Sequence, residues 1–190
     1  MWPTIDFELG VWNAWIFMLL SLLTWPLFFR LAKVRAPHPS RIGLSKPKMI
    51  FCIFSKLIFL PAVAYSFFLP LKFGTIWFYV GLPITLVGLV ASVTVLVNWA
   101  STTPGKPVTR GLYRYSRHPM YVANSLFLLG VSIASASWVF LLFPIIMTVG
   151  AVVFIGLEEQ QCLEHYGNVY REYMNRTPKW IGIPKSQSLS

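Results

Sequence analysis

The sequence predicts an all-α, polytopic membrane protein with five transmembrane helices. Hydrophobic residues make up 56% of the 190 residues and charged residues only 12%, and the mean hydropathy is +0.62. Long apolar runs alternate with short segments that hold nearly all the lysines and arginines. Because an ordinary soluble domain carries about 25% charged residues, these observations exclude that class and indicate a chain that crosses lipid several times.

The first apolar run, residues 11–31, has the length of about 20 residues that one crossing requires. Pro26 is expected to bend this helix near its end. The residues before it include Asp6 and Glu8 but no lysine or arginine. They therefore lack the basic region of a secretory signal, and we expect the first helix to be retained.

A basic, proline-broken loop follows at residues 30–48, with six lysines and arginines. Such residues accumulate on the cytoplasmic side of membrane proteins, where they contact anionic lipid head groups. We therefore interpret this loop as a topological signal. The net charge of +10 is thus explained by the membrane rather than by nucleic acid.

Residues 49–69 and 75–100 are predicted to form the second and third helices, joined as a tight hairpin by a short connection. Lys56 lies inside the second helix, and we expect its ammonium to reach the interface or a polar cavity rather than lipid. In the third helix, Gly81 and Gly88 provide small surfaces. Small surfaces of this kind favour close helix packing in a membrane.

A second basic segment, residues 101–119, precedes an apolar stretch at 120–157 that is far longer than one crossing. Ser135 and Ser137 supply its only break, so helices four and five are expected to meet there. This arrangement puts 14 of the 16 lysines and arginines on one side. The sequence therefore predicts an N-terminus outside and a C-terminus in the cytoplasm.

Residues 111–121 place tyrosines, arginines and a histidine between two apolar runs. Polar groups at a membrane edge cost free energy, so they are functional by default. His118-Pro119 lies where a helix should begin, because proline suits the first helical position. The unpaired N–H groups and the positive dipole end of that helix, with Arg117 beside them, predict an anion site.

This motif is followed by Glu158-Glu159 and then by the run HYGNVYREY at 165–173. In this combination, the region from about 98 to 178 resembles the integral-membrane methyltransferases of the isoprenylcysteine carboxyl methyltransferase and phospholipid methyltransferase group. The resemblance implies an enzyme that uses S-adenosylmethionine. We expect three N-terminal helices, 1–100, and a catalytic region, 101–190. The five-helix topology brings the motif, at the start of helix four, and the glutamates, at the end of helix five, to the same membrane face, so the cofactor site is expected on the cytoplasmic side.

Individual residues can be matched to parts of this cofactor. Arg117 or His118 suits the carboxylate, and Glu158 suits ribose hydroxyls or the ammonium. We predict catalytic roles for Arg117, His118 and Glu159. The resemblance implies cofactor contacts at Asn98, Gly105, Lys106, Pro107, Val108, Tyr113, His118, Pro119, Met120, Tyr121 and Glu158.

The acceptor is expected to be lipophilic and to enter between helices from the bilayer. An isoprenylcysteine-type carboxylate is already ionised and needs no base, and it is our first expectation. A phospholipid ethanolamine is the alternative, and it must first lose a proton to a base such as Glu159 or His118. In the eukaryotic carboxyl methyltransferases a substrate-linked arginine precedes the glutamates by one turn. Here that position is Phe154, which counts against prenylcysteine.

Two other classes of protein stay open at this point. Membrane sterol reductases look similar near their C-terminal cofactor sites and use NADPH, and a small non-enzymatic subunit could use the motif to bind a partner. The three histidines, His38, His118 and His165, show no metal-ligand spacing, so we expect no metal. No phosphate-binding glycine loop occurs either.

Overall fold

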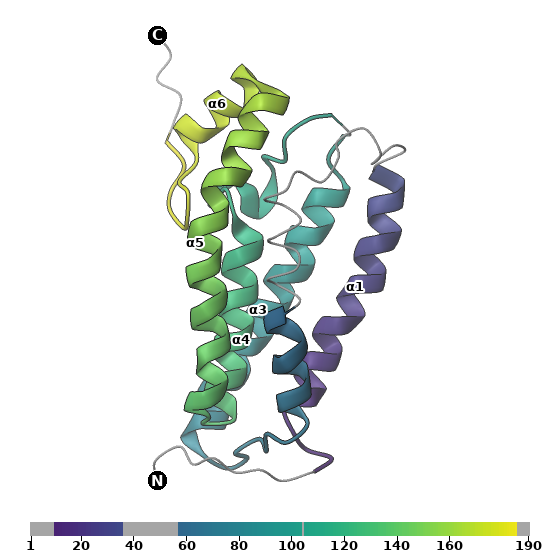
Figure 1. The fold of residues 1–190 in the computed structure, drawn as a ribbon, viewed down its shortest axis with the longest axis vertical. Helices are drawn as coiled ribbons and strands as arrows, with labels where there is room; N and C mark the ends of the chain where they lie inside the picture. Colours follow the sequence, from purple (N-terminus) through teal and green to yellow (C-terminus); the bar gives the residue numbers. More distant parts are fainter. Residues whose placement is uncertain (1–9, 36–56, 104, 186–190) are drawn as a thin grey trace.

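The computed structural model describes residues 10–35, 57–103 and 105–185, and their regular structure is helical apart from one isolated β-bridge between Asn13 and Pro70. The long helices run side by side along the longest axis, and a short terminal helix lies beyond one end (Figure 1). The helices are α1 (Trp15–Arg35), Leu57–Ser66, α3 (Ile76–Ala100), the 3-10 turn η2 (Gly111–Arg114), α4 (Pro119–Ala134), α5 (Trp138–Tyr166) and α6 (Asn168–Arg176).

The closest packing joins α3 to α4. A Cβ atom on Gly81 would collide with the backbone of Ala134, and one on Gly88 would collide with the backbone of Phe127. Gly130 on α4 lies in the same way against Thr85 on α3. The predicted use of Gly81 and Gly88 as close-packing surfaces is therefore confirmed, and these glycines hold the two helix backbones in contact.

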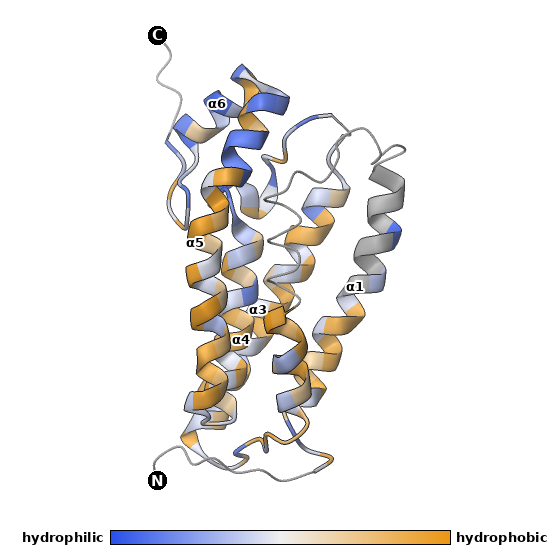
Figure 2. Ribbon diagram, viewed as in Figure 1, coloured by the Kyte–Doolittle hydropathy of each residue, from blue (hydrophilic) through white to orange (hydrophobic). Residues whose placement is uncertain are grey.

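The buried core lies where the start of α1 and the connection before α3 meet the C-terminal half of α4 and the first turn of α5. Its members include Met18, Leu69, Val131 and Phe140, all nearly inaccessible. Outside this core the long helices expose valine, leucine and isoleucine, and the hydrophilic residues gather at the end that carries α6 (Figure 2). An apolar exterior with a polar end is what a lipid-embedded bundle requires.

Two of the described helices, α3 and α5, are long and apolar enough to cross a membrane, not the five that the sequence predicted. The apolar parts of the others, Trp15–Thr24, Leu57–Ser66 and Pro119–Ala134, are shorter. At about 1.5 Å per residue, the 16 residues of α4 rise about 24 Å, less than the roughly 30 Å of hydrocarbon. The start of the second predicted helix, with Lys56, lies outside the described residues.

The stretch at 120–157 divides into two helices where the sequence predicted. Helix α4 ends at Ala134, and the Ser137 hydroxyl caps α5 by accepting from Phe140 N. Helix α5, however, continues past residue 157 to Tyr166 and stops only at Gly167, whose φ is +56°. Glu158 and Glu159 consequently lie within α5 rather than at its end. The helix therefore fixes the position of both residues relative to the start of α4.

Candidate functional site

The N-terminus of α4 forms one wall of the site, as predicted from His118-Pro119. His118 is the N-cap residue, with φ −127° and ψ 53°, and Pro119 takes the first helical position. The His118 N–H donates to Ser116 Oγ at 3.1 Å, which turns the chain into the helix. The first turn of a helix leaves its backbone N–H groups without partners inside the helix, so this end carries a partial positive charge.

Glu159 on α5 lies at the centre of a charged cluster. Its Oε1 is 3.1 Å from His118 Nε2 and 3.3 Å from Arg117 Nε, and its Oε2 is 3.8 Å from Lys179 Nζ. The residue is only 8% exposed, and a buried carboxylate is tolerated because cations and hydrogen bonds compensate it. The predicted meeting of the 117–118 motif with the glutamate pair is therefore present in the structure.

Glu158 occupies the preceding position on α5, and its side chain has different neighbours. Tyr121 donates its hydroxyl to Glu158 Oε2 at 3.0 Å, and His118 Nδ1 lies 3.7 Å from the same oxygen. The imidazole thus stands between two carboxylates. The Glu158 side chain is 41% exposed, so this carboxylate is accessible to a ligand while Glu159 is not.

Two buried donors in the described part of the chain have no hydrogen-bond partner, namely Asn98 Nδ2 and Arg117 Nε. Arg117 Nε is within ion-pair distance of Glu159, but its N–H is not aligned for a hydrogen bond. Asn98 lies in the last turn of α3 against Gly111, where a Cβ atom would collide with the Asn98 amide. An unpaired buried donor costs about 1–3 kcal/mol, so both donors suit a bound molecule with acceptor oxygens or nitrogens.

The C-terminal segment holds the motif in place from the other side. Tyr173 on α6 donates its hydroxyl to the Tyr113 carbonyl at 2.7 Å. The Arg117 N–H donates to the Pro178 carbonyl at 3.0 Å, and the Gly182 N–H to the Tyr115 carbonyl at 3.0 Å. Burial raises the pKa of the Tyr173 phenol well above its ordinary value, so the hydroxyl remains a donor at neutral pH.

A sequence model of the phospholipid methyltransferase family matches residues 73–169, just over half of the chain. The chain belongs to the phospholipid methyltransferase family. Membership makes it an integral-membrane methyltransferase in broad class, in agreement with the resemblance seen in the sequence. A search of curated proteins found no match to the chain.

The expected cofactor residues of this methyltransferase lie in five segments, of which α5 contributes Glu158. Asn98 lies in the last turn of α3, Tyr113 belongs to η2, and His118, Pro119, Met120 and Tyr121 begin α4. Gly105, Lys106, Pro107 and Val108 lie in the loop between α3 and η2, where Lys106 N donates to Thr103 O. Direct contacts join His118 and Tyr121 to Glu158, whereas the loop residues remain predicted contacts.

Sequence reasoning missed the contributions of Lys179 and Tyr173. Neither residue belongs to the expected catalytic or cofactor sets, and Tyr173 appears in the sequence analysis only as part of the 165–173 run. The spacing of Tyr170 and Tyr173 was the available signal, because it puts both rings on one face of α6. Tyr166 is the last residue of α5, and Gly167 separates it from that helix. No metal-binding group of three or more His, Cys, Asp or Glu is found within the described residues.

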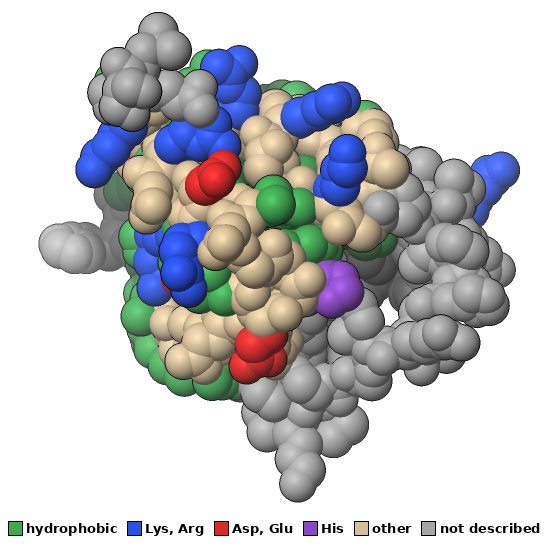
Figure 3. Space-filling view, turned by 90° about the horizontal axis from the view of Figure 1, so that it is seen from above, with side chains coloured by type: hydrophobic (Ala, Val, Ile, Leu, Met, Phe, Trp, Pro, Cys, Tyr) green, Lys and Arg blue, Asp and Glu red, His purple; other side chains and the backbone are tan. Residues whose placement is uncertain are grey.

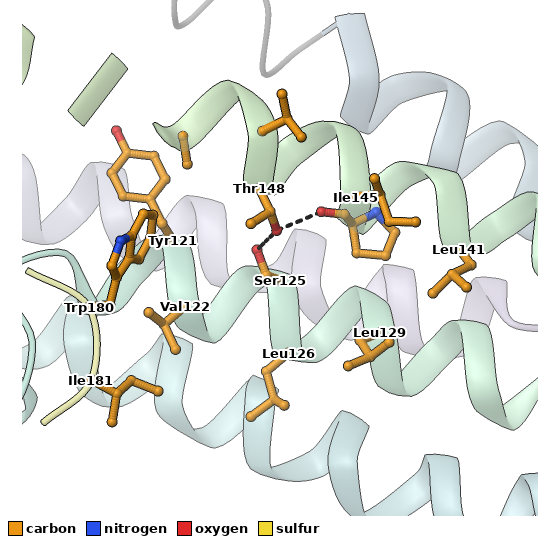
Figure 4. A pocket seen from close by; sticks show the side chains of 13 residues that line it. Tyr121, Val122, Ser125, Leu126, Leu129, Leu141, Ile145, Thr148, Trp180 and Ile181 are labelled. Atoms are coloured by element: carbon orange, nitrogen blue, oxygen red, sulfur yellow. Dashed lines mark hydrogen bonds between the residues drawn. The ribbon is translucent and has the colours of Figure 1, made fainter. Parts of the chain in front are cut away.

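An apolar groove of about 680 Å³ runs between α4 and α5 and begins at the charged cluster. Figure 4 shows Tyr121 and Trp180 at one end and Leu141 at the other, with Ser125 and Thr148 hydrogen-bonded between them at 3.0 Å. The other lining residues are Val122, Leu126, Leu129, Pro144, Ile145, Val149, Ala151 and Ile181. Tyr121 therefore belongs both to this groove and, through Glu158, to the polar cluster.

Proposed function

We propose that this family member transfers a methyl group from S-adenosylmethionine to the carboxylate of an isoprenylcysteine-type lipophilic acceptor. The observation that carries the proposal is the position of Tyr121, which joins the charged cluster to the apolar groove. A charged methyl donor requires a polar site, a lipophilic acceptor requires an apolar one, and methyl transfer requires the two sites to be adjacent. Family membership favours this activity over a sterol-type reductase or a non-enzymatic subunit.

The residues at the helix ends fit the cofactor. Bound S-adenosylmethionine would supply an electrophilic methyl group on its sulfonium. The first turn of α4 and Arg117 would hold its carboxylate, and the accessible Glu158 would accept from its ribose hydroxyls or ammonium. Asn98 offers an amide donor that is buried and unpaired, and Tyr113 and Tyr121 offer aromatic surfaces for adenine or the sulfonium.

Methyl transfer is an in-line displacement, so the protein contributes mainly by positioning. Both oxygens of Glu159 are already close to cationic or imidazole nitrogens, from Arg117 and His118 at one and Lys179 at the other. Glu159 is also buried, so it is poorly placed to reach an ammonium substrate. This arrangement supports an acceptor that is nucleophilic without deprotonation, and in it Glu159 orients Arg117 and His118.

A phospholipid amine is the second candidate. Glu158 favours it, because its side chain is 41% exposed and could take a proton from the ammonium. The Phe154 position, where the carboxyl methyltransferases carry an arginine, also counts in its favour. The choice between the two acceptors thus depends on whether Glu158 is used for the cofactor or for the acceptor.

The proposed orientation puts the site in the cytoplasm and the N-terminus outside. The end that carries the site also carries most of the described lysines and arginines, several of which are visible when the molecule is viewed from that end (Figure 3). An excess of these residues is typical of the cytoplasmic face. A water-soluble methyl donor would reach the site from there.

The direct test is a methyl-transfer assay on the purified protein in detergent. Labelled S-adenosylmethionine is incubated with farnesylated and geranylgeranylated N-acetylcysteine, and with phosphatidylethanolamine. Label on the prenylcysteines alone supports the first acceptor, and label on the amino lipid alone supports the second. Absence of transfer to either acceptor, with no binding of S-adenosylhomocysteine, would reject the proposal.

The groove makes a separate prediction about the acceptor. Leu126→Trp should fill part of it and raise the KM for the lipid acceptor about tenfold, since one large side chain displaces several buried methylene groups of the ligand. The affinity for S-adenosylhomocysteine should not change. Leu142→Trp is the matched control, because Leu142 lies on the exposed surface of α5 and does not line the groove. If both substitutions change the KM for the lipid acceptor equally, the groove does not bind the acceptor.

Glu158→Gln should weaken S-adenosylhomocysteine binding at least about tenfold, because the charged acceptor for hydroxyl or ammonium groups is lost. Isothermal calorimetry in detergent measures this, with NADPH as a second titrant. Glu172→Gln, an exposed position on α6, serves as the control and should bind normally. Unchanged affinity in Glu158→Gln would mean that Glu158 contacts the methyl acceptor and not the cofactor. A protein that binds NADPH but not S-adenosylhomocysteine would favour a reductase.

A further inference from the structure

A second hollow, of about 380 Å³, lies beside α6 and away from the Glu159 cluster. Its lining is Thr109, Arg114, Tyr173, Arg176, Thr177, Pro184 and Lys185. Three of these seven side chains are cationic and none is acidic. The hollow therefore has a strongly positive lining, and the charged cluster described above does not include any of the three cations.

The hollow is built from segments far apart in the sequence. Arg114 ends η2, Arg176 ends α6, and Lys185 comes from the tail, whose N–H donates to the Arg176 carbonyl at 2.9 Å. Tyr173 and Thr177 are buried and form its inner surface. The fold thus brings three cations, which would repel one another at short range, around one cavity.

The C-terminal end of a helix normally disfavours anions, because its last carbonyls point outward. Here two of those carbonyls are occupied. The Thr177 N–H donates to the Tyr173 carbonyl at 3.0 Å, and the Arg176 carbonyl accepts from Lys185. Arg176 Nε donates to the Glu172 carbonyl at 3.4 Å. The side chains that line the hollow offer guanidinium, ammonium and hydroxyl donors to a ligand.

We propose that this hollow binds a phosphoryl group. Arginine forks match phosphate oxygens with paired hydrogen bonds, and a lysine and two threonine hydroxyls complete a donor set around them. Arg176 and Thr177 place the hollow beside α6, which lies at one end of the bundle (Figure 1). That end carries most of the described basic residues, and a membrane interface places lipid phosphates against such a surface. The phosphoryl group belongs either to an anionic lipid or to a soluble phosphate.

Binding there would act on the methyltransferase site through the tail. The segment 178–185 supplies Lys185 to the hollow, Lys179 to Glu159 and Trp180 to the apolar groove. A phosphoryl group that ties Lys185 to Arg114 and Arg176 would stabilise the tail against the body of the protein. The binding site itself does not depend on the proposed methyl transfer.

The experiment measures binding to the purified protein in maltoside detergent by microscale thermophoresis. The probes are dioctanoyl phosphatidic acid, inorganic phosphate and dioctanoylglycerol, which lacks the phosphoryl group. The double variant Arg114→Gln/Arg176→Gln should bind phosphatidic acid at least about tenfold more weakly than the parent. Arg171→Gln removes the same kind of charge from an exposed position on α6 outside the lining, and should change affinity less than about twofold.

Competition by inorganic phosphate would assign the site to a soluble phosphate, and its failure to compete would assign it to a lipid head group. Either result supports a phosphoryl site. Equal binding of dioctanoylglycerol, no binding of any probe, or an equal loss in Arg171→Gln would overturn it. If the double variant does not fold, as judged by its thermal unfolding, Lys185→Gln in the tail provides the same comparison.

Discussion

Glu159→Gln is expected to lower kcat about 100-fold and to destabilise the protein by about 2 kcal/mol. The substitution keeps the shape of the side chain and removes its charge. His118 then loses a charged hydrogen-bond partner, and Arg117 and Lys179 lose their shared counterion. Hydrogen bonds to charged groups contribute about 1.5–3 kcal/mol each, and a displacement of about 1 Å in a positioning group costs about 100-fold in rate. Labelled methyl transfer and thermal unfolding in detergent measure the two effects.

Glu164→Gln is the matched control for this prediction. Glu164 lies five residues further along α5 and is exposed, so both its activity and its stability should equal those of the parent. A Glu159→Gln protein with parental kcat would show that the charged cluster is structural. If S-adenosylhomocysteine binding is lost as well as activity, Glu159 contacts the cofactor directly and does not act only by orienting Arg117 and His118.

Gly88→Ala should destabilise the protein by about 3 kcal/mol, although alanine is normally the better helix former. The added Cβ atom would overlap the Phe127 backbone, and overpacking of a tight contact costs about 1–3 kcal/mol or more. Because α3 and α4 would have to separate, Asn98 and the first turn of α4 should also lose their relative position. S-adenosylhomocysteine affinity should therefore fall together with the melting temperature.

Gly156→Ala provides the opposite result from the same substitution. No atom lies within 4 Å of a Cβ atom at this exposed position of α5, so the gain in helix propensity, up to about 1 kcal/mol, should appear as higher stability. Melting temperatures of the two variants are compared in the same detergent. Stabilisation by both substitutions would mean that α3 and α4 are not in backbone contact at Gly88.

The site could not be assembled in detail from the sequence, because the contact that positions it joins two helices distant in the chain. The glycines of α3 are predicted to pack closely, but nothing in their own segment identifies α4 as the partner. That contact brings Asn98, at the end of α3, to Gly111 and the motif. Small residues indicate that two backbones meet, and only the fold identifies which two.

The meeting of the motif and the glutamate pair was predictable in outline, because apolar and charged segments alternate along the chain. The apolar stretch at 120–157 had to divide near Ser135 and Ser137, so the residues before and after it had to return to one end. His118 and Glu159 are therefore expected at the same end, and they lie 3.1 Å apart. Lys179 was not predictable, because a single basic residue in a tail has no periodic signal that points to a partner.

The sequence by itself determined the helical class, the membrane environment, the helix start at Pro119, the meeting of helices near Ser135 and the family. These properties follow from local composition and periodicity, which each segment carries alone. The tertiary structure decided that two rather than five described helices are long and apolar enough to span, and that α5 carries Glu158 and Glu159 within it. It also decided which cations surround Glu159 and which surround the hollow beside α6, since those contacts depend on how separate segments pack.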